Sequence, residues 1–191
     1  MAIHKTITTA GIYFITFTCH KWLPLIKQTK AYDLMYKWFN ILNSEGHTIV
    51  GYVIMPNHIH LMLHYNGGYP SLNTIIGNGK RFLAYDIVKR LKELQLDNLL
   101  KRLEKDTRVK DQQRGKKHEV WIAAFDAKEC RTDDFAFQKL QYMHNNPCSG
   151  RWKLAESIID YPHSSALFYI TRKIGSYPIK DYRDFLTIDE D

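Results

Sequence analysis

The chain has 191 residues, of which 45% are hydrophobic, and these values predict one globular domain with a substantial core. Its apolar runs are too short to cross a membrane and its N-terminus lacks the layout of a signal peptide, so we expect a cytoplasmic protein with no membrane partner. Three widely spaced cysteines form no C-x-x-C pair, which argues against a zinc ribbon or a dithiol redox motif.

Basic residues are concentrated in one segment of the chain, residues 80–118. This segment holds thirteen Lys or Arg against six Asp or Glu, a net charge of +7 that equals the formal charge of the whole chain. Such a concentration favours a polyanionic partner such as nucleic acid. A solvated, charged helix without a ligand is the alternative that charge alone leaves open.

The first half of the chain predicts three strands and one helix. Residues 12–18 are mostly aromatic or β-branched, which is typical of a strand. Residues 30–44 carry apolar side chains at helical spacing. Residues 47–55 and 58–65 predict two more strands, joined by a tight turn at Pro56-Asn57.

Helix signals follow in the middle of the chain. Ser71 is a candidate N-cap for a helix over residues 72–91. Gly77-Asn78-Gly79 lies inside this helix and predicts a kink or an early end. Polar residues dominate the stretch 95–113, which predicts a mobile loop or a nucleic-acid contact.

The last third of the chain predicts one strand and two helices. The strand is expected at residues 119–125. A helix follows from residue 133 to about 146, with Thr132 or Asp133 as its cap and Pro147 as its stop. Residues 161–169 predict a short helix that precedes an irregular tail.

This order of elements predicts an α+β fold with a mainly antiparallel central sheet and helices packed against it. We expect one domain over residues 1–170 and a C-terminal tail over residues 171–191. Neither a G-x-G-x-x-G after a strand nor a Walker-type phosphate loop occurs, so the sequence gives no support for NAD or ATP.

Residues 55–62, MPNHIHLM, place two histidines one residue apart in a predicted strand. Alternate strand residues share a face, so His58 and His60 form half of a divalent-metal site. Hydrogen-bonded structural histidines are the simplest alternative. The histidine-triad hydrolases and the cupin oxygenases fit poorly, because Met62 and His64 stand where they require a third histidine and an acid, respectively.

The predicted helix at 133–146 carries a polar stripe on one face. Gln138, Tyr142 and Asn146 follow one another at intervals of four residues, which aligns them along the helix. A tyrosine in such a place is usually an amphipathic residue at the edge of a core. The stripe by itself therefore leaves the role of Tyr142 open.

Two segments together resemble a known family. Residues 51–61, GYVIMPNHIHL, and residues 140–147, LQYMHNNP, resemble the HUH single-tyrosine transposases of bacterial insertion sequences. The REP-associated tyrosine transposase group is the closer match, because the chain also resembles it at residues 13–17 (YFITF), 80–82 (KRF), 120–121 (VW) and 161–165 (YPHSS). The resemblance spans residues 12–169 and implies the HUH endonuclease fold, a ferredoxin-like sandwich.

The resemblance also implies roles for individual residues. His58 and His60 would bind Mg²⁺ or Mn²⁺, and Tyr142 would be the nucleophile. Asn146 stands where related enzymes place a third polar ligand, often glutamine, and its carbonyl oxygen suits a hard cation. His64 and His144 are weaker candidates for orienting other groups or contacting DNA.

The activity implied by the resemblance is metal-dependent nicking and rejoining of single-stranded DNA through a 5′-phosphotyrosine, next to a DNA hairpin. Lys80, Arg81, Lys89 and Arg90 are the expected contacts to the DNA backbone, and a homodimer is one expected assembly. Two other functions stay open. One is a domesticated DNA-binding protein of the same fold with weak catalysis, and the other is a metal-dependent hydrolase of a small phosphorylated substrate.

Overall fold

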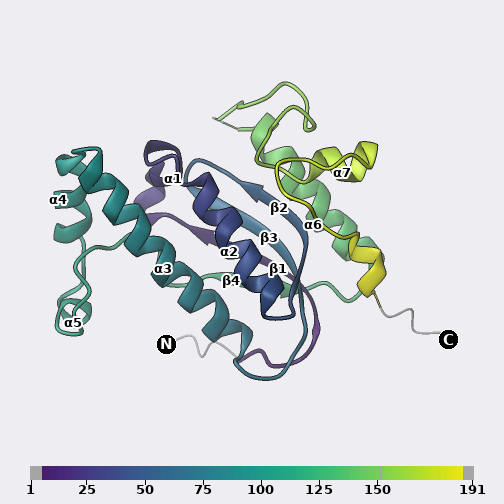
Figure 1. Ribbon diagram of the computed structural model, residues 1–191, viewed down its shortest axis with the longest axis horizontal. Coiled ribbons are helices and arrows are strands. Elements are labelled where there is room, and N and C mark those ends of the chain that lie inside the picture. Colours follow the sequence, from purple (N-terminus) through teal and green to yellow (C-terminus); the bar gives the residue numbers. More distant parts are fainter. Residues whose placement is uncertain (1–5, 151, 187–191) are drawn as a thin grey trace.

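A four-stranded antiparallel sheet forms the centre of the molecule, in a computed structural model that describes residues 6–150 and 152–186. The strands lie in the order β2-β3-β1-β4 (Figure 1). Their bounds are β1 Gly11–Thr18, β2 Thr48–Ile54, β3 His58–Tyr65 and β4 Asp126–Glu129. The predicted α+β class and the antiparallel sheet are confirmed.

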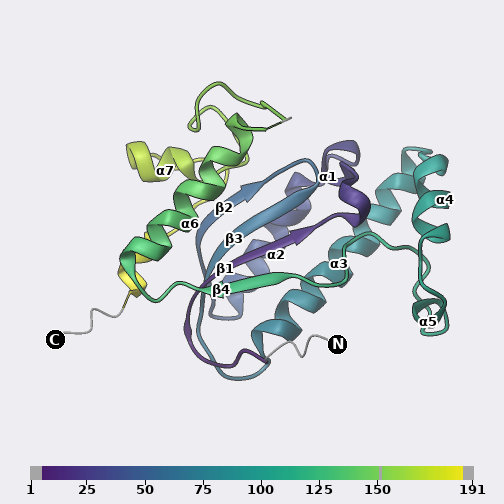
Figure 2. The same ribbon diagram turned by 180° about the vertical axis from the view of Figure 1, so that it is seen from behind.

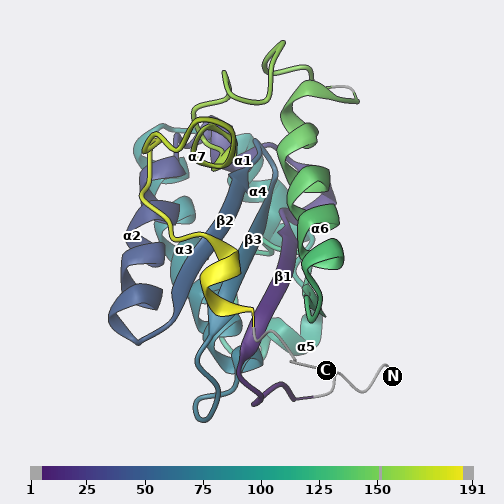
Figure 3. The same ribbon diagram turned by 90° about the vertical axis from the view of Figure 1, so that its right-hand side faces the viewer.

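Helices cover both faces of this sheet, with α2 and α3 on one face and α6 on the other (Figure 3). The α-helices are α1 Leu25–Gln28, α2 Tyr32–Ser44, α3 Leu72–Glu93, α4 Asp97–Lys105, α5 Val109–Gln112, α6 Asp133–Asn145 and α7 Ala166–Thr171. Three short 3-10 helices complete the description: η1 His20–Trp22, η2 Asn146–Cys148 and η3 Tyr182–Phe185. Within the described residues no helix is long and apolar enough to cross a membrane.

The alternation of side chains along the strands divides the interior into two cores. In β1, Tyr13 and Ile15 pack in the larger core under α2 and α3, whereas Ile12 and Phe14 pack in the smaller core under α6. In β3 the residue between the two histidines, Ile59, belongs to the larger core. His58 and His60 therefore point to the α6 face.

Predicted boundaries near the candidate site are confirmed. The turn between β2 and β3 closes with a 2.8 Å hydrogen bond from the Met55 N–H to the His58 carbonyl. The Thr132 hydroxyl accepts a hydrogen bond from the Phe135 N–H and caps α6. Pro147 lies in η2, directly after α6.

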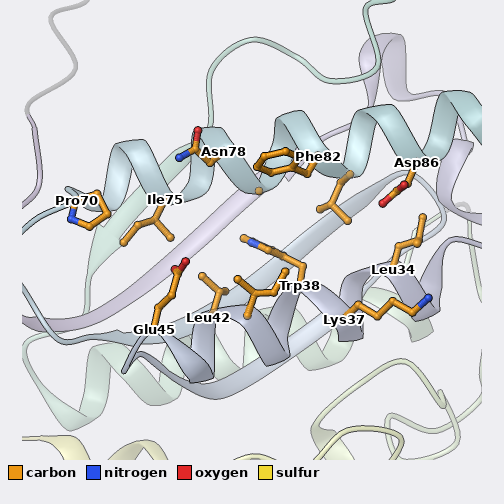
Figure 4. A pocket seen from close by; sticks show the side chains of 13 residues that line it. Leu34, Lys37, Trp38, Leu42, Glu45, Pro70, Ile75, Asn78, Phe82 and Asp86 are labelled. Atoms are coloured by element: carbon orange, nitrogen blue, oxygen red, sulfur yellow. The ribbon is translucent and has the colours of Figure 1, made fainter.

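Helix α3 runs without interruption through Gly77 and Gly79, so the expected kink or early end is wrong. A Cβ atom at Gly79 would collide with the indole of Trp38 on α2. Glycine is therefore required where the Trp38 indole packs against α3, and the helix tolerates its low propensity. A pocket of about 230 Å³ opens beside this contact, lined by Leu42, Ile75 and Phe82 among others (Figure 4).

Two predictions for the middle of the chain are corrected. Residues 119–125 form no strand, apart from a single bridge between Trp121 and Cys19. The carbonyls of residues 122–124 accept hydrogen bonds from the Lys80 ammonium instead of pairing with a strand, and β4 begins only at Asp126, at the edge of the sheet (Figure 2). The stretch 95–113 contains the helices α4 and α5 rather than a loop, because Leu103 and its leucine neighbours pack against the larger core.

The described part of the expected tail, through residue 186, packs against both cores: Tyr177 and Ile179 against the larger one, and Tyr182, Phe185 and Leu186 against the smaller one. Tyr182 is fully buried and its hydroxyl donates a 2.7 Å hydrogen bond to Asp133 at the start of α6. Phe185 stacks on His64 with ring centroids 4.3 Å apart. This segment thus joins the first turn of α6 to the end of β3.

Candidate active site

The two histidines of β3 lie side by side under α6. Their ring centroids are 4.8 Å apart, and His58 and His60 are only 6% and 3% exposed. The pairing of β3 with β1 sets His60 opposite Thr16 and His58 opposite Thr18. The sequence prediction that both rings share one face is confirmed by this register.

Each histidine ring is oriented by a hydrogen bond at its Nδ1 atom. His58 Nδ1 lies 2.7 Å from Asn57 Oδ1, and the Asn57 amide nitrogen donates to the Trp22 carbonyl at 3.2 Å. The Asn57 oxygen therefore faces His58, which places the proton of that ring on Nδ1. His60 Nδ1 lies 2.8 Å from the Thr16 hydroxyl.

The opposite nitrogen of His60, Nε2, is buried and has no hydrogen-bond partner among the described residues. A proton on Nε2 would leave a buried N–H without an acceptor, whereas a proton on Nδ1 is donated to Thr16. Both rings thus present the Nε2 lone pair. This is the arrangement in which protein imidazoles bind a cation while a second hydrogen bond fixes their orientation.

Burial keeps both rings uncharged at neutral pH. It lowers the pKa of His58 to about 4. Burial, together with repulsion from His58, lowers the pKa of His60 to about 3. The nearby Asn146 side chain raises both pKa values, but by less than burial lowers them. A neutral imidazole is the form that can bind a metal.

Asn146 completes a set of three donors. It begins η2 directly after α6, and its amide nitrogen donates to the Tyr142 carbonyl at 2.8 Å. Its carbonyl oxygen is then available to the two histidines with which the side chain interacts. In residues 6–150 and 152–186 no three His, Cys, Asp or Glu side chains are grouped as a metal site, and the Asn146 amide is the candidate for a third donor.

These residues fit a divalent cation. Two Nε2 lone pairs converge from a rigid strand, one of them buried and unpartnered among the described residues, and an amide oxygen lies beside them. Three protein donors leave positions open for water and substrate oxygen. The set suits Mn²⁺, which accepts both imidazole and oxygen ligands, and it suits Mg²⁺ less well.

Tyr142 lies over the histidines from α6. Its ring centroid is 5.4 Å from that of His60, and the side chain is 55% exposed. Its helix lies close to the sheet because Gly51 in β2 has no side chain, and a Cβ there would press on Met143 and Leu140. The structure thus brings the predicted nucleophile and the predicted ligands together in one chain.

Other polar residues predicted on these elements lie away from the histidine pair. His64 is covered by Phe185, and His144 is buried with its Nε2 2.9 Å from the Ser165 hydroxyl. Ser165 also hydrogen-bonds to the backbone of Tyr52 in β2. His144 on α6 is therefore linked to the sheet through Ser165. Gln138 is exposed one turn before Tyr142.

The four basic residues expected to contact DNA belong to α3, on the opposite face of the sheet from the histidines. The expectation for Lys80 is corrected, because it is only 7% exposed and its ammonium donates to the carbonyls of residues 122–124. Burial lowers its pKa to about 8. Arg90 binds both carboxylate oxygens of Asp33, whereas Arg81 and Lys89 are exposed.

Two lysines near the site were not found from the sequence. Phe14 stacks on His60 with ring centroids 5.4 Å apart, and Lys128 is its partner across the pairing of β1 with β4. The Lys139 ammonium lies 5.9 Å from the centroid of the Phe14 ring. Only the strand register and the packing of α6 place these two lysines around Phe14, whose ring centroid lies 6.1 Å from that of Tyr142, so no local sequence pattern could have shown them.

The overall fold of this chain is similar to that of a solved transposase structure. No protein-family model matches the chain, and no curated protein matches it. Among solved structures, a REP-associated tyrosine transposase bound to a REP hairpin is similar over 97% of this chain and 95% of its own, with a TM-score of 0.57 and 15% identity. The chain has the fold of a tyrosine transposase. A Deinococcus radiodurans R1 protein, provisionally described as a transposase, matches over 76% of this chain and 97% of its own, with 14% identity and a TM-score of 0.46.

Proposed function

We propose that this protein is a transposase that nicks and rejoins single-stranded DNA through a phosphotyrosine at Tyr142. The observation that carries the proposal is the contact between the Tyr142 ring and His60 within one chain. A structural histidine pair would not require an exposed tyrosine, an unpartnered Nε2 and an amide oxygen at the same place. The solved relative with this fold binds a REP hairpin, which supports a hairpin next to the cleavage site.

His58 Nε2, His60 Nε2 and the Asn146 carbonyl oxygen would hold the cation. Bound Mg²⁺ or Mn²⁺ would offset the negative charge that develops on the scissile phosphate. Thr16 and Asn57 hold the two rings in the tautomer that this requires. Burial keeps both rings neutral, so protons do not compete for the ligand atoms near neutral pH.

Tyr142 would supply the nucleophilic oxygen. Its hydroxyl gives up a proton to water and attacks phosphorus; the new O–P bond forms as the bond to the 3′ oxygen breaks, and that oxygen takes up a proton from water and leaves as a 3′-hydroxyl. A 3′-hydroxyl from another strand reverses these changes and frees the tyrosine. Since the energy of the phosphodiester is conserved, rejoining needs no ATP.

Basic side chains near Tyr142 are the proposed contacts to the scissile strand. Lys128 and Lys139 flank Phe14 next to the tyrosine, and together they can bind backbone phosphates. The exposed Arg81 and Lys89 of α3 are proposed as more distant contacts, on the other face of the sheet. Because Tyr142 reaches the histidines of its own chain, one copy of the chain can form a complete site and a homodimer is not required.

Covalent trapping tests the proposal. Purified protein with Mn²⁺ is incubated with a labelled oligonucleotide that carries a hairpin and a single-stranded flank, and the products are separated under denaturing conditions. Wild type should form a covalent adduct and Tyr142→Phe should form none. Tyr85→Phe removes the hydroxyl of an exposed tyrosine on α3 and should behave as wild type. A covalent adduct formed by Tyr142→Phe would contradict the assignment of Tyr142 as the nucleophile.

A DNA-binding protein with weak catalysis is the second candidate. One observation favours it, because the third donor is an amide rather than a carboxylate or histidine and should hold a cation weakly. Tight hairpin binding by wild type with no adduct in either metal would identify this case. A hydrolase of small phosphorylated substrates would also give no adduct, but it would show no preference for the hairpin.

A further inference from the structure

An open pocket of about 610 Å³ adjoins the donors of the candidate metal site. His58 and Asn146 form one side of it. Two indoles, those of Trp22 and Trp152, contribute to its remaining lining. Trp22 is exposed, whereas Trp152 is partly buried against the smaller core, and both lie beside the place where a scissile phosphate would bind.

Trp22 is held in this position against the preference of the backbone. It is 53% exposed, and Trp22 and Lys21 both have left-handed backbones, with φ values of 58° and 49°. Two successive non-glycine residues in this region cost about 1 kcal/mol or more each and persist only where their surroundings hold them. Folding alone does not account for placing a strained, exposed indole here.

The turn that carries Trp22 is anchored on both sides. Its carbonyl accepts the hydrogen bond from the Asn57 amide, the same side chain that orients His58. On the other side, Lys21 and His20 both bind the Asp106 carboxylate, at 2.7 and 3.0 Å. The Trp22 ring lies edge-on to His58 with centroids 5.7 Å apart. The backbone that carries the indole is therefore held in place before any ligand arrives.

We propose that Trp22 and Trp152 form a nucleobase subsite that binds the unpaired base next to the scissile phosphate. A base is a flat aromatic ring, and stacking on an indole is a main source of affinity for single strands. The pocket reaches His58 and Asn146, so a base between the indoles has its phosphate beside the metal donors. The proposal rests on the proposed function, since it takes the scissile strand as the occupant.

Base stacking can be separated from charge with two probes of equal length. One is a thymidine dodecamer and the other is a dodecamer of abasic deoxyribose phosphates. Binding is measured by fluorescence anisotropy in protein that carries Tyr142→Phe, so that no covalent product forms. This parent should bind the thymidine probe at least tenfold more tightly, and adding Trp22→Ala should reduce that ratio about tenfold while leaving the abasic affinity unchanged.

Two further variants control for folding and for position. Trp22→Phe keeps an aromatic ring and should retain most of the ratio. Tyr85→Ala removes an exposed ring from α3 and should leave the ratio as in the parent. An equal ratio in the parent and in Trp22→Ala, or no preference for thymidine in the parent, would overturn the subsite.

The two proposals fail in different ways. The affinity ratio is measured without the nucleophile, so it does not depend on cleavage. If the subsite is wrong, wild type still forms the covalent adduct and Trp22→Ala keeps the ratio. If cleavage is wrong, no adduct forms with the hairpin substrate, and the dependence of base binding on Trp22 persists.

Discussion

At the scale of single residues, the candidate metal site is organised by two side chains that would not touch the metal. Thr16 and Asn57 fix the proton of each histidine on Nδ1, which turns both Nε2 lone pairs toward the same space. Outer hydrogen bonds of this kind typically change metal affinity by about 10- to 100-fold.

Replacing Thr16 tests this arrangement. Thr16→Val keeps the shape of the side chain and removes the hydroxyl, so the His60 ring loses its orienting partner and the affinity for Mn²⁺ should fall at least about tenfold. Calorimetric titration of Mn²⁺ into DNA-free protein measures the change. Thr16→Ser retains the hydroxyl and should remain close to wild type. Equal affinities in the two variants would contradict the role of the hydroxyl.

The sequence could locate His58 and His60 because strand alternation is a local property. Tyr142 was found through a resemblance, since its own helical pattern left its role open. Thr16 could not be selected, because its contact with His60 depends on the register between β1 and β3, which no local pattern fixes. Asn57 adjoins His58 in sequence, but its orientation depends on the distant carbonyl of Trp22.

At the scale of elements, close helix packing explains where local signals failed. The Gly77-Asn78-Gly79 stretch predicts a break, yet α3 continues because Gly79 admits the Trp38 indole. The expected strand at 119–125 also fails because of a distant contact. Lys80, more than forty residues earlier in the sequence, donates hydrogen bonds to the carbonyls of residues 122–124. Caps at Ser71 and Thr132 were predictable because they act within one helical turn.

The two glycines of α3 provide a matched pair for this explanation. Gly79→Ala should lower the free energy of unfolding by about 1–3 kcal/mol, because the added methyl group overpacks against Trp38. A methyl group added at Gly77 would meet open space, with no neighbouring atom of the described residues within 4 Å. Gly77→Ala should therefore leave stability unchanged or raise it by up to about 1 kcal/mol. Urea denaturation measures both. Equal effects at the two positions would show that helix propensity alone decides them.

At the scale of the whole molecule, buried histidines link stability to pH. Burial lowers the pKa of His58 to about 4, that of His60 to about 3 and that of His144 to about 4. The unfolded chain therefore binds these protons near pH 6.5, and the folded chain binds them only at much lower pH. The free energy of unfolding should be highest above pH 6.5 and should fall as the pH drops from 6.5 toward 4.

Each such histidine can add a slope of up to about 1.4 kcal/mol per pH unit in that window. Urea denaturation of the metal-free protein at a series of pH values measures the sum. His144→Gln keeps a polar partner for Ser165 and removes one titrating ring, so its curve should be shallower between pH 6.5 and 4. An unchanged slope would mean that His144 titrates normally in the folded state.

The distribution of charge predicts which lysines contribute to DNA binding. For single strands, each phosphate contact adds about 0.7 to the slope of log affinity against log salt. Replacing both Lys128 and Lys139 by alanine should therefore reduce the slope by about 1.4, measured by anisotropy between about 50 and 300 mM KCl. The matched pair Lys89→Ala and Lys92→Ala lies on α3, across the sheet, and should reduce it less. A larger reduction of the slope for the Lys89 and Lys92 pair than for the Lys128 and Lys139 pair would place the scissile strand on the α3 face.

Gly51 has a consequence for how such a site could be tuned. Its single hydrogen lets α6 approach β2, and the helix carries Tyr142 toward the histidines. Larger side chains at this position would act as spacers beneath the helix. The methyl group of alanine would press on the flexible ends of Met143 and Leu140, and the larger, branched side chain of valine would press on them more. The position of Tyr142 over the histidines would then be adjustable in graded steps from inside the protein, without altering any atom proposed to contact DNA or metal.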